Sequence, residues 1–181
     1  MYVFACYADR FLSNRKGEFA MKRVIVIGCP GSGKTTFAEK LSKRTGLPLY
    51  YLDAIWHKPD KTHISREEFD QRIQEIFATD KWIIDGNYNR TVEMRLKECD
   101  TVILFDLPTE VCLQGVIERL GKYHYDLPWI EKELDPEFES FIKSFANNSL
   151  PELYELIEKY GAEKQVIIFK SRKDADAFLE P

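Results

Sequence analysis

The sequence predicts one α/β domain, built on a five-stranded parallel sheet with helices on both faces. Five short apolar runs rich in β-branched residues recur along the chain, and segments with helical spacing of apolar residues separate them. Strands that alternate with helices indicate a parallel sheet, because each crossover helix covers a face of the sheet. The chain has 181 residues, 44% of them hydrophobic, which is enough for one sizeable core.

The individual elements follow from local patterns. Uninterrupted apolar runs, typical of strands buried on both faces, are RVIVIG (23–28), LPLYYLD (47–53), KWIID (81–85), DTVILFDLP (100–108) and QVIIFK (165–170). Helical spacing predicts helices at about 33–44, 65–79, 91–98, 108–120, 136–148, 151–160 and 173–179. Ser65 to Glu68 form a capping box, which marks the start of the second helix.

The first 20 residues differ from the rest of the chain. Their apolar stretch is too short for a signal peptide and is interrupted by Asp9. The run MKRVIVIG, beginning at Met21, is typical of a domain that opens on its first strand. We therefore expect residues 1–20 to be an N-terminal extension outside the functional domain, the alternative being an arm that packs on it, and residues 21–181 to form the domain.

Composition argues against several classes of function. A net charge of -4 and a pI near 5.5 disfavour a protein whose main task is to grip nucleic-acid phosphates. No apolar run approaches the roughly 20 residues that a membrane-spanning helix needs. The four cysteines lack metal-binding spacing, which favours reduced thiols in a cytoplasmic protein. Either a monomer or a homodimer is compatible with these data.

Residues 28–35 match the G-x-x-x-x-G-K-[ST] pattern of a P-loop, or Walker A motif, between a buried strand and a helix. In this motif, backbone N–H groups and the helix N-terminus surround phosphate oxygens, the lysine reaches the β- and γ-phosphates, and the hydroxyl ligates Mg²⁺. The motif predicts ATP and Mg²⁺ as cofactors. The predicted binding residues are Gly28, Pro30, Gly31, Ser32, Gly33, Lys34, Thr35 and Thr36.

Three aspartates end predicted strands: Asp53, Asp85 and Asp106. The carboxyl ends of parallel strands lie at the edge where open α/β sheets bind ligands, so at least one should act beside the P-loop. We assign Asp106 to Mg²⁺ together with Thr35, since such an aspartate holds the metal in P-loop proteins. Either Asp53 or Asp85 is then expected to orient the acceptor.

From Met21 onward, the chain resembles the P-loop proteins called DNA topology modulation (FlaR-related) proteins. The likeness is carried by GCPGSGKTT, YLDAIWHKP, WIIDGNY, DLPWIEKELDPEF and VIIFKSRKDADAFL, which spread over nearly all of residues 21–180. That family looks related to adenylate and shikimate kinases. Its name reflects a genetic association, and direct nucleic-acid binding is not expected.

The resemblance to adenylate kinase extends to two further segments. WIIDGNYNRT looks like the LDGFPRT stretch, whose arginine binds the acceptor phosphate and corresponds here to Arg90, with one extra residue before it. ERLGK (118–122) looks like the end of the helix that opens the lid, which makes Arg119 a phosphate-binding catalytic residue. The segment at about 121–135 is too short for a large lid and implies a short helical one.

The remaining site predictions concern the walls of the cleft. Trp56 is a candidate wall of the acceptor site, and Asn87 and Tyr88 are expected at its floor. Arg172, after the last strand, is placed where related folds hold the adenine base.

Taken together, the sequence predicts a P-loop NTPase three-layer fold with strand order 2-3-1-4-5. The favoured function is transfer of the γ-phosphate of ATP to a small acceptor such as a nucleoside, a nucleotide or another hydroxyl compound. The predicted catalytic residues are Lys34, Asp53, Asp85 and Arg119. The alternative is an ATP-binding regulatory protein with weak ATPase activity that acts through partners, including an influence on DNA topology.

Overall fold

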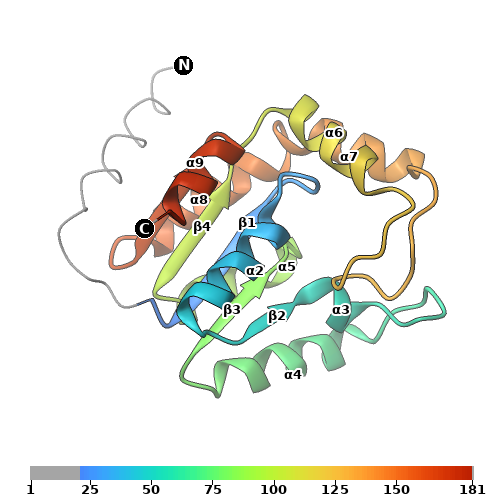
Figure 1. Cartoon of the computed structure of the whole chain (residues 1–181). Coiled ribbons are helices and arrows are strands. Elements are labelled where there is room, and N and C mark those ends of the chain that lie inside the picture. The colour runs from blue at the N-terminus through green and yellow to red at the C-terminus, as the bar shows by residue number, and fades with distance from the viewer. Residues whose placement is uncertain (1–20, 181) are drawn as a thin grey trace.

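Five parallel strands form the sheet at the centre of the molecule, in the order β2-β3-β1-β4-β5 (Figure 1). The computed structural model describes residues 21–180, so the expectation for residues 1–20 lies outside the described residues. The strands are β1 (Arg23–Gly28), β2 (Leu49–Tyr51), β3 (Trp82–Asp85), β4 (Thr101–Phe105) and β5 (Gln165–Phe169). The predicted fold class and strand order are confirmed.

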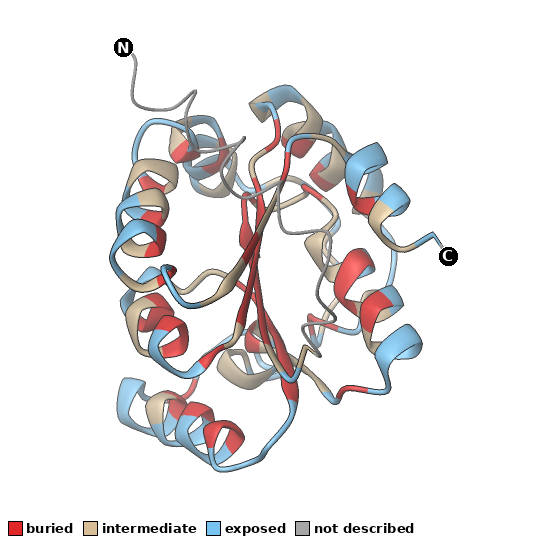
Figure 2. Cartoon of the chain, turned by 90° about the vertical axis from the view of Figure 1, so that its left-hand side faces the viewer, coloured by how far each residue is buried: buried red, intermediate tan, exposed pale blue. Residues whose placement is uncertain are grey.

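Helices cover both faces of this sheet, and their buried sides face the strands (Figure 2). They are α2 (Lys34–Thr45), α3 (Leu52–Trp56), α4 (Arg66–Phe77), α5 (Asn89–Glu98), α6 (Thr109–Arg119), α7 (Pro136–Phe145), α8 (Ser149–Tyr160) and α9 (Arg172–Phe178). Helix α2 packs on β1, β2 and β3, while α5 contacts α8 and α6 contacts α7. Ser65 caps α4 by accepting a hydrogen bond from the Glu68 N–H at 3.0 Å, as the capping box predicts.

The hydrophobic core lies between the sheet and the helices that cover it. All residues of β3 and β4 are buried, which explains why their sequences are continuous apolar runs rather than alternating ones. Phe37 of α2 packs edge-on against Phe105 and Phe169, with ring centroids 5.5 and 5.2 Å apart. In residues 21–180 the cysteines are buried free thiols, and no helix is long and apolar enough to cross a membrane.

One strand prediction was too long. LPLYYLD was expected to remain extended to Asp53, but β2 ends at Tyr51 and α3 begins at Leu52. The reason is the period of the apolar residues: Leu52 is fully buried, and Ile55 and Trp56 pack against the same core. This spacing of three and four residues is helical, and it places Asp53 in the first turn of a helix.

The lid segment also differs from expectation. Residues 120–135 contain no helix, so the predicted short helical lid is an irregular loop. Gly121 leaves α6 with φ 74°, and Pro128 interrupts the segment further on. The loop runs from the end of α6 toward α3 and returns to α7 (Figure 1), and the Trp129 ring lies 5.0 Å from that of His57. The lid loop therefore connects α6 and α7 with the part of the chain near α3.

Candidate active site

The P-loop connects β1 to α2 and has the strand-loop-helix geometry that the sequence predicts. Gly31 has φ 75°, a region that L side chains rarely adopt, and a Cβ there would overlap the carbonyl oxygen of Cys112 on α6. The loop is thus pressed against α6 at Gly31, where no side chain would fit. Such a loop at a helix N-terminus is suited to an anion.

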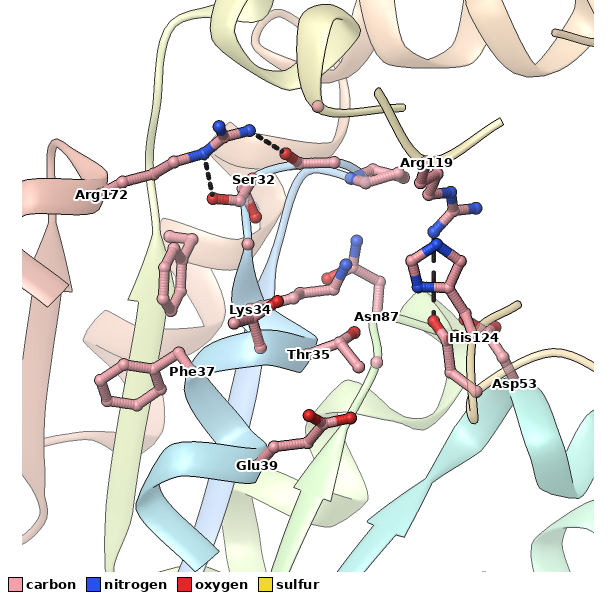
Figure 3. Close-up of a pocket in the computed structure, with 18 of the residues that line it drawn as sticks. Ser32, Lys34, Thr35, Phe37, Glu39, Asp53, Asn87, Arg119, His124 and Arg172 are labelled. Atoms are coloured by element: carbon pink, nitrogen blue, oxygen red, sulfur yellow. Dashed lines mark hydrogen bonds and ion pairs between the residues drawn. The ribbon is translucent and has the colours of Figure 1, made fainter. Parts of the chain in front are cut away.

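A cleft of about 670 Å³ opens over this loop. Figure 3 shows Asp53 and His124 on one side of Lys34 and Thr35, and Arg172 on the other. Among residues 21–180, no ion pair engages Lys34, which lines the cleft. The buried Ser32 hydroxyl also lacks a hydrogen-bond partner within the described chain. Both groups are therefore available to a ligand such as a triphosphate, and the cleft residues fit one.

Thr35 lines the cleft and is hydrogen-bonded to Asp85, which is buried and is not itself a lining residue. The Thr35 hydroxyl donates to Asp85 Oδ2 at 2.6 Å. Strand β3 neighbours β1, with Asp85 beside Val26, which brings the carboxylate to the P-loop. Burial raises the pKa of Asp85 from 3.8 to about 6, and Lys34 and the hydrogen bond from Thr35 oppose that rise. Asp85 Oδ1 has no partner in the described chain, so this pair offers hard oxygen ligands that fit Mg²⁺.

Asn87 holds the P-loop in place. Its Oδ1 accepts from the Gly28 N–H at 2.8 Å, and its Nδ2 donates to the Gly28 carbonyl at 2.6 Å. Asn87 lines the cleft, as predicted, but both ends of its amide are engaged by the backbone. Its role is therefore to fix the first glycine of the loop rather than to bind an acceptor.

Asp53 and Tyr88 form a second polar pair in the cleft. The Tyr88 hydroxyl donates to Asp53 Oδ1 at 2.8 Å, and both residues line the cavity. Burial, followed by the nearby Asp53 charge, raises the pKa of Tyr88, so the phenol remains a proton donor. The second oxygen of Asp53 stays available to an acceptor hydroxyl.

Trp56, Arg90 and Asp106, like Gly28 and the buried Asp85, are predicted site residues that do not line the cleft. Trp56 stacks on His63, with ring centroids 4.5 Å apart, and contacts the Tyr88 ring edge-on, with centroids 5.9 Å apart. The Arg90 guanidinium binds both oxygens of Asp70 on the surface, at 2.7 and 2.6 Å. Asp106 accepts hydrogen bonds from Tyr154, at 2.6 Å, and from Lys170, and it does not line the cleft.

Two predicted arginines line the cleft but are engaged by the protein. Arg119 donates to Glu131 of the lid loop at 2.7 Å and is only 20% exposed at its side chain. Arg172 donates to the carbonyls of Gly31 and Ser32, at 2.9 and 3.4 Å (Figure 3). Arg172 thus supports the P-loop from the side of α9.

Sequence reasoning missed three residues near the site: Glu39, Arg95 and Asp126. Arg95 carried a signal, because it lies four residues after Thr91 on the apolar face of α5, where an arginine needs buried partners. Glu39 and Asp126 line the cleft. Asp126 reaches it through the path of the lid loop, which no local pattern reveals.

Arg95 is fully buried under the segment that carries Asn87 and Tyr88. Its guanidinium donates to the carbonyls of Gly86, at 2.7 Å, of Asn87, and of Thr91, at 3.3 Å. Burial lowers its pKa to about 9. The side chain therefore satisfies backbone groups that would otherwise be buried without donors.

Replacing Arg95 by methionine is expected to lower the free energy of unfolding by about 3 kcal/mol, because buried carbonyls lose their donors. Denaturant unfolding measures this change. Lys97→Met is the matched control on the same helix, since Lys97 makes an exposed ion pair with Glu93 at 3.0 Å. Equal stability of the two variants would contradict the role given to Arg95.

Comparison with known proteins agrees with this geometry. A family model described as an AAA domain matches residues 24–121, more than half of the chain, and the chain therefore belongs to that family. The adenylate kinase of Thermotoga neapolitana is 28% identical over 88 residues, which cover 48% of this chain and 39% of that enzyme. The adenylate kinase of Clavibacter michiganensis subsp. michiganensis is 31% identical over 80 residues, covering 44% and 38%. The chain spans about two fifths of the length of these relatives.

Solved structures agree on the fold. The shikimate kinase from Bacteroides thetaiotaomicron superposes with a TM-score of 0.55 at 14% identity, covering 88% of this chain and 94% of that one. The shikimate kinase from Acinetobacter baumannii, solved in complex with shikimate, gives 0.58 at 16% identity, covering 88% and 91%. The protein thus has the P-loop fold of small-molecule kinases.

Proposed function

We propose that this protein is an ATP·Mg²⁺-dependent phosphotransferase that phosphorylates a small hydroxyl acceptor. The observation that carries the proposal is that the P-loop and Asp53 line one cleft, and that Thr35 of this loop is hydrogen-bonded to Asp85. Phosphoryl transfer requires positioning and charge neutralisation more than covalent chemistry, and these groups supply both. The sequence similarity to adenylate kinases supports the same class of reaction.

On the donor side, the loop backbone and Lys34 would hold the phosphates of ATP. Thr35 and Asp85 would hold Mg²⁺. Asp85 would thus have the metal-binding role that the sequence suggested for Asp106. When bound, Mg²⁺ neutralises charge on the β- and γ-phosphates. Arg119, which lines the cleft beside the lid loop, would release Glu131 to reach the moving phosphoryl group.

On the acceptor side, Asp53 would orient the hydroxyl and receive its proton. Its carboxylate is held by the Tyr88 hydroxyl, which fixes the orientation of the free oxygen. A general base must lie within hydrogen-bond reach of the proton that it takes, and the second oxygen of Asp53 would meet this requirement for an acceptor bound in the cleft.

The test is a panel of nucleosides, nucleotides and small alcohols incubated with ATP and Mg²⁺, with phosphorylated product detected by mass spectrometry. Asp53→Asn is expected to lower kcat by about 10² to 10⁴-fold while ATP binding, measured by calorimetry, survives. Asp80→Asn removes an exposed aspartate far from the cleft and is the control. Equal activity of the two variants would refute the role of Asp53.

The resemblance to FlaR-related proteins favours a second candidate, an ATP-binding regulator that influences DNA topology through partners. If the whole panel stays inert and only slow hydrolysis is seen, this candidate replaces the kinase. Direct DNA binding is measured separately as salt-sensitive affinity for a duplex. The net charge of -4 predicts no such binding at physiological salt.

A further inference from the structure

The cleft has two chemically different halves. The half formed by the P-loop presents backbone N–H groups and Lys34, which suit a triphosphate. The other half, called here the acceptor half, is lined by three carboxylates, Glu39, Asp53 and Asp126. The inference below concerns this half and rests on the proposed kinase function.

Asp126 is the strongest indication of a ligand. It lies on the lid loop, lines the cleft and is only 5% exposed. Its Oδ1 has no hydrogen-bond partner among the described residues. Its Oδ2 lies 4.0 Å from Arg119, whose guanidinium binds Glu131 at 2.7 Å instead. A buried carboxylate without a close donor is costly, so a ligand that brings a donor would be bound favourably.

The neighbouring groups share a negative potential. Burial raises the pKa of Asp85 most, and the charges of Asp53 and Asp126 raise it further. The pKa of Tyr51 is raised by burial and then by Glu39, Asp85 and Asp126. Nowhere in residues 21–180 do three acidic, histidine or cysteine side chains lie close enough to share one metal ion. A metal bound at Asp85 would therefore not neutralise the whole acceptor half.

The arginines that would bind an anionic acceptor are engaged elsewhere. Arg90 is paired with Asp70 outside the cleft, and Arg95 is buried among backbone carbonyls. Arg119 is bound to Glu131, and if it leaves Glu131 its proposed partner is the transferred phosphoryl group rather than the acceptor. A phosphate or carboxylate on the acceptor would lie beside carboxylates of the same charge, and like charges at close range repel each other.

We propose that the acceptor is a small alcohol that also carries a protonated amino group, and that Asp126, with Glu39 nearby, binds this ammonium group. A hydroxyl of the same molecule would lie at Asp53. The hydroxyl oxygen attacks the γ-phosphorus of ATP, the bond from that phosphorus to the β-phosphate bridging oxygen breaks, and ADP leaves. The hydroxyl proton passes to Asp53 and then to water.

Matched acceptors test the proposal on the wild-type protein. D-glucosamine is compared with N-acetyl-D-glucosamine and D-glucose, and 2-aminoethanol with ethylene glycol, while AMP and shikimate represent anionic acceptors. The amines are expected to show a kcat/KM at least tenfold above that of their neutral counterparts, and the anions no turnover. Binding of the same probes in the presence of Mg²⁺ and a non-hydrolysable ATP analogue is measured by calorimetry.

A second experiment uses the variant Asp126→Asn in the same binding measurements. The substitution should weaken amine binding about tenfold and leave the affinity for the ATP analogue within twofold. Glu133→Gln, an exposed residue of the same loop, is the matched control and should change neither. The comparison of amine with N-acetyl compound uses the wild-type chain, so it remains decisive if Asp126→Asn does not fold.

The outcomes separate this inference from the proposed function. Turnover of AMP or shikimate, or equal turnover of amines and neutral compounds, overturns the inference while the kinase function stands. Amine binding that depends on Asp126 but without any phosphoryl transfer supports the ammonium site and counts against the kinase. The absence of selective amine binding overturns the inference whatever the activity.

Discussion

Replacing Lys34 by methionine is expected to lower kcat for phosphoryl transfer by about 10³-fold while the protein stays folded. Lys34 lines the cleft and has no ion pair within residues 21–180, so its charge is free to meet the γ-phosphate. Loss of one preorganised charge that acts on the transition state costs about 10² to 10³-fold, and a cation beside a moving phosphoryl group belongs at the upper end. Methionine keeps the unbranched stem and the helix propensity at the first position of α2.

The measurement is ADP release with the best acceptor of the panel, together with thermal unfolding. Lys43→Met is the matched control, because Lys43 lies on the same helix and is exposed. The control is expected to keep activity within twofold. A Lys34→Met protein that remains fully active would remove the P-loop from the reaction and, with it, the proposed function.

The sequence was sufficient for the fold and for the strand-loop-helix geometry of the P-loop. Continuous apolar runs predicted strands that prove to be buried on both faces, and the P-loop motif predicted a loop whose glycines have the required positive φ. These features are local, since they depend on residues adjacent in the chain. Side-chain partners are not local, and there the predictions were less successful.

The strand-end aspartates illustrate this limit. Strands β3 and β4 both flank β1, so Asp85 and Asp106 were equivalent candidates for the metal. The structure distinguishes them: Asp85 accepts from Thr35, whereas Asp106 is engaged by Tyr154, 48 residues further along the chain. No spacing rule reveals such a partner.

The predictions for the arginines were incomplete for the same reason. Arg90 occupies the predicted position in sequence, but its charge is taken by Asp70 of α4. Arg119 faces the cleft as expected, yet Glu131 of the lid loop neutralises it. Asp126 was not predicted at all, because an irregular loop brings it to the cleft. The chemical character of the acceptor half therefore depends on tertiary contacts rather than on the motifs.

The carboxylate of Asp85 destabilises the folded protein at neutral pH. Its pKa is raised from 3.8 to about 6, so between these values the folded state keeps a proton that the unfolded chain loses. Stability from this group therefore falls as pH rises through that window. Well above pH 6 both states are ionised and the penalty is complete, on the order of 3 kcal/mol.

Asp85→Asn is consequently expected to raise the free energy of unfolding by on the order of 2 kcal/mol at pH 7.5, and to change it little at pH 4. Denaturant unfolding at the two pH values measures this difference. The neutral amide still offers an oxygen to the Thr35 hydroxyl, so this contact survives. Lower stability of the variant at pH 7.5 would show that the buried charge is compensated in the folded state.

The same substitution should abolish the Mg²⁺ dependence of ATP affinity, because a metal ligand must be ionised. In the wild-type protein this dependence should weaken as pH falls below 6, where Asp85 takes up its proton. Asp106→Asn is the discriminating control and should leave Mg²⁺-dependent affinity within twofold, since Asp106 lies outside the cleft. A stabilised Asp85→Asn protein that has lost its response to Mg²⁺ would indicate that the unfavourable burial of this carboxylate is retained for the metal. If Asp106→Asn lost that response instead, the metal would belong at the end of β4.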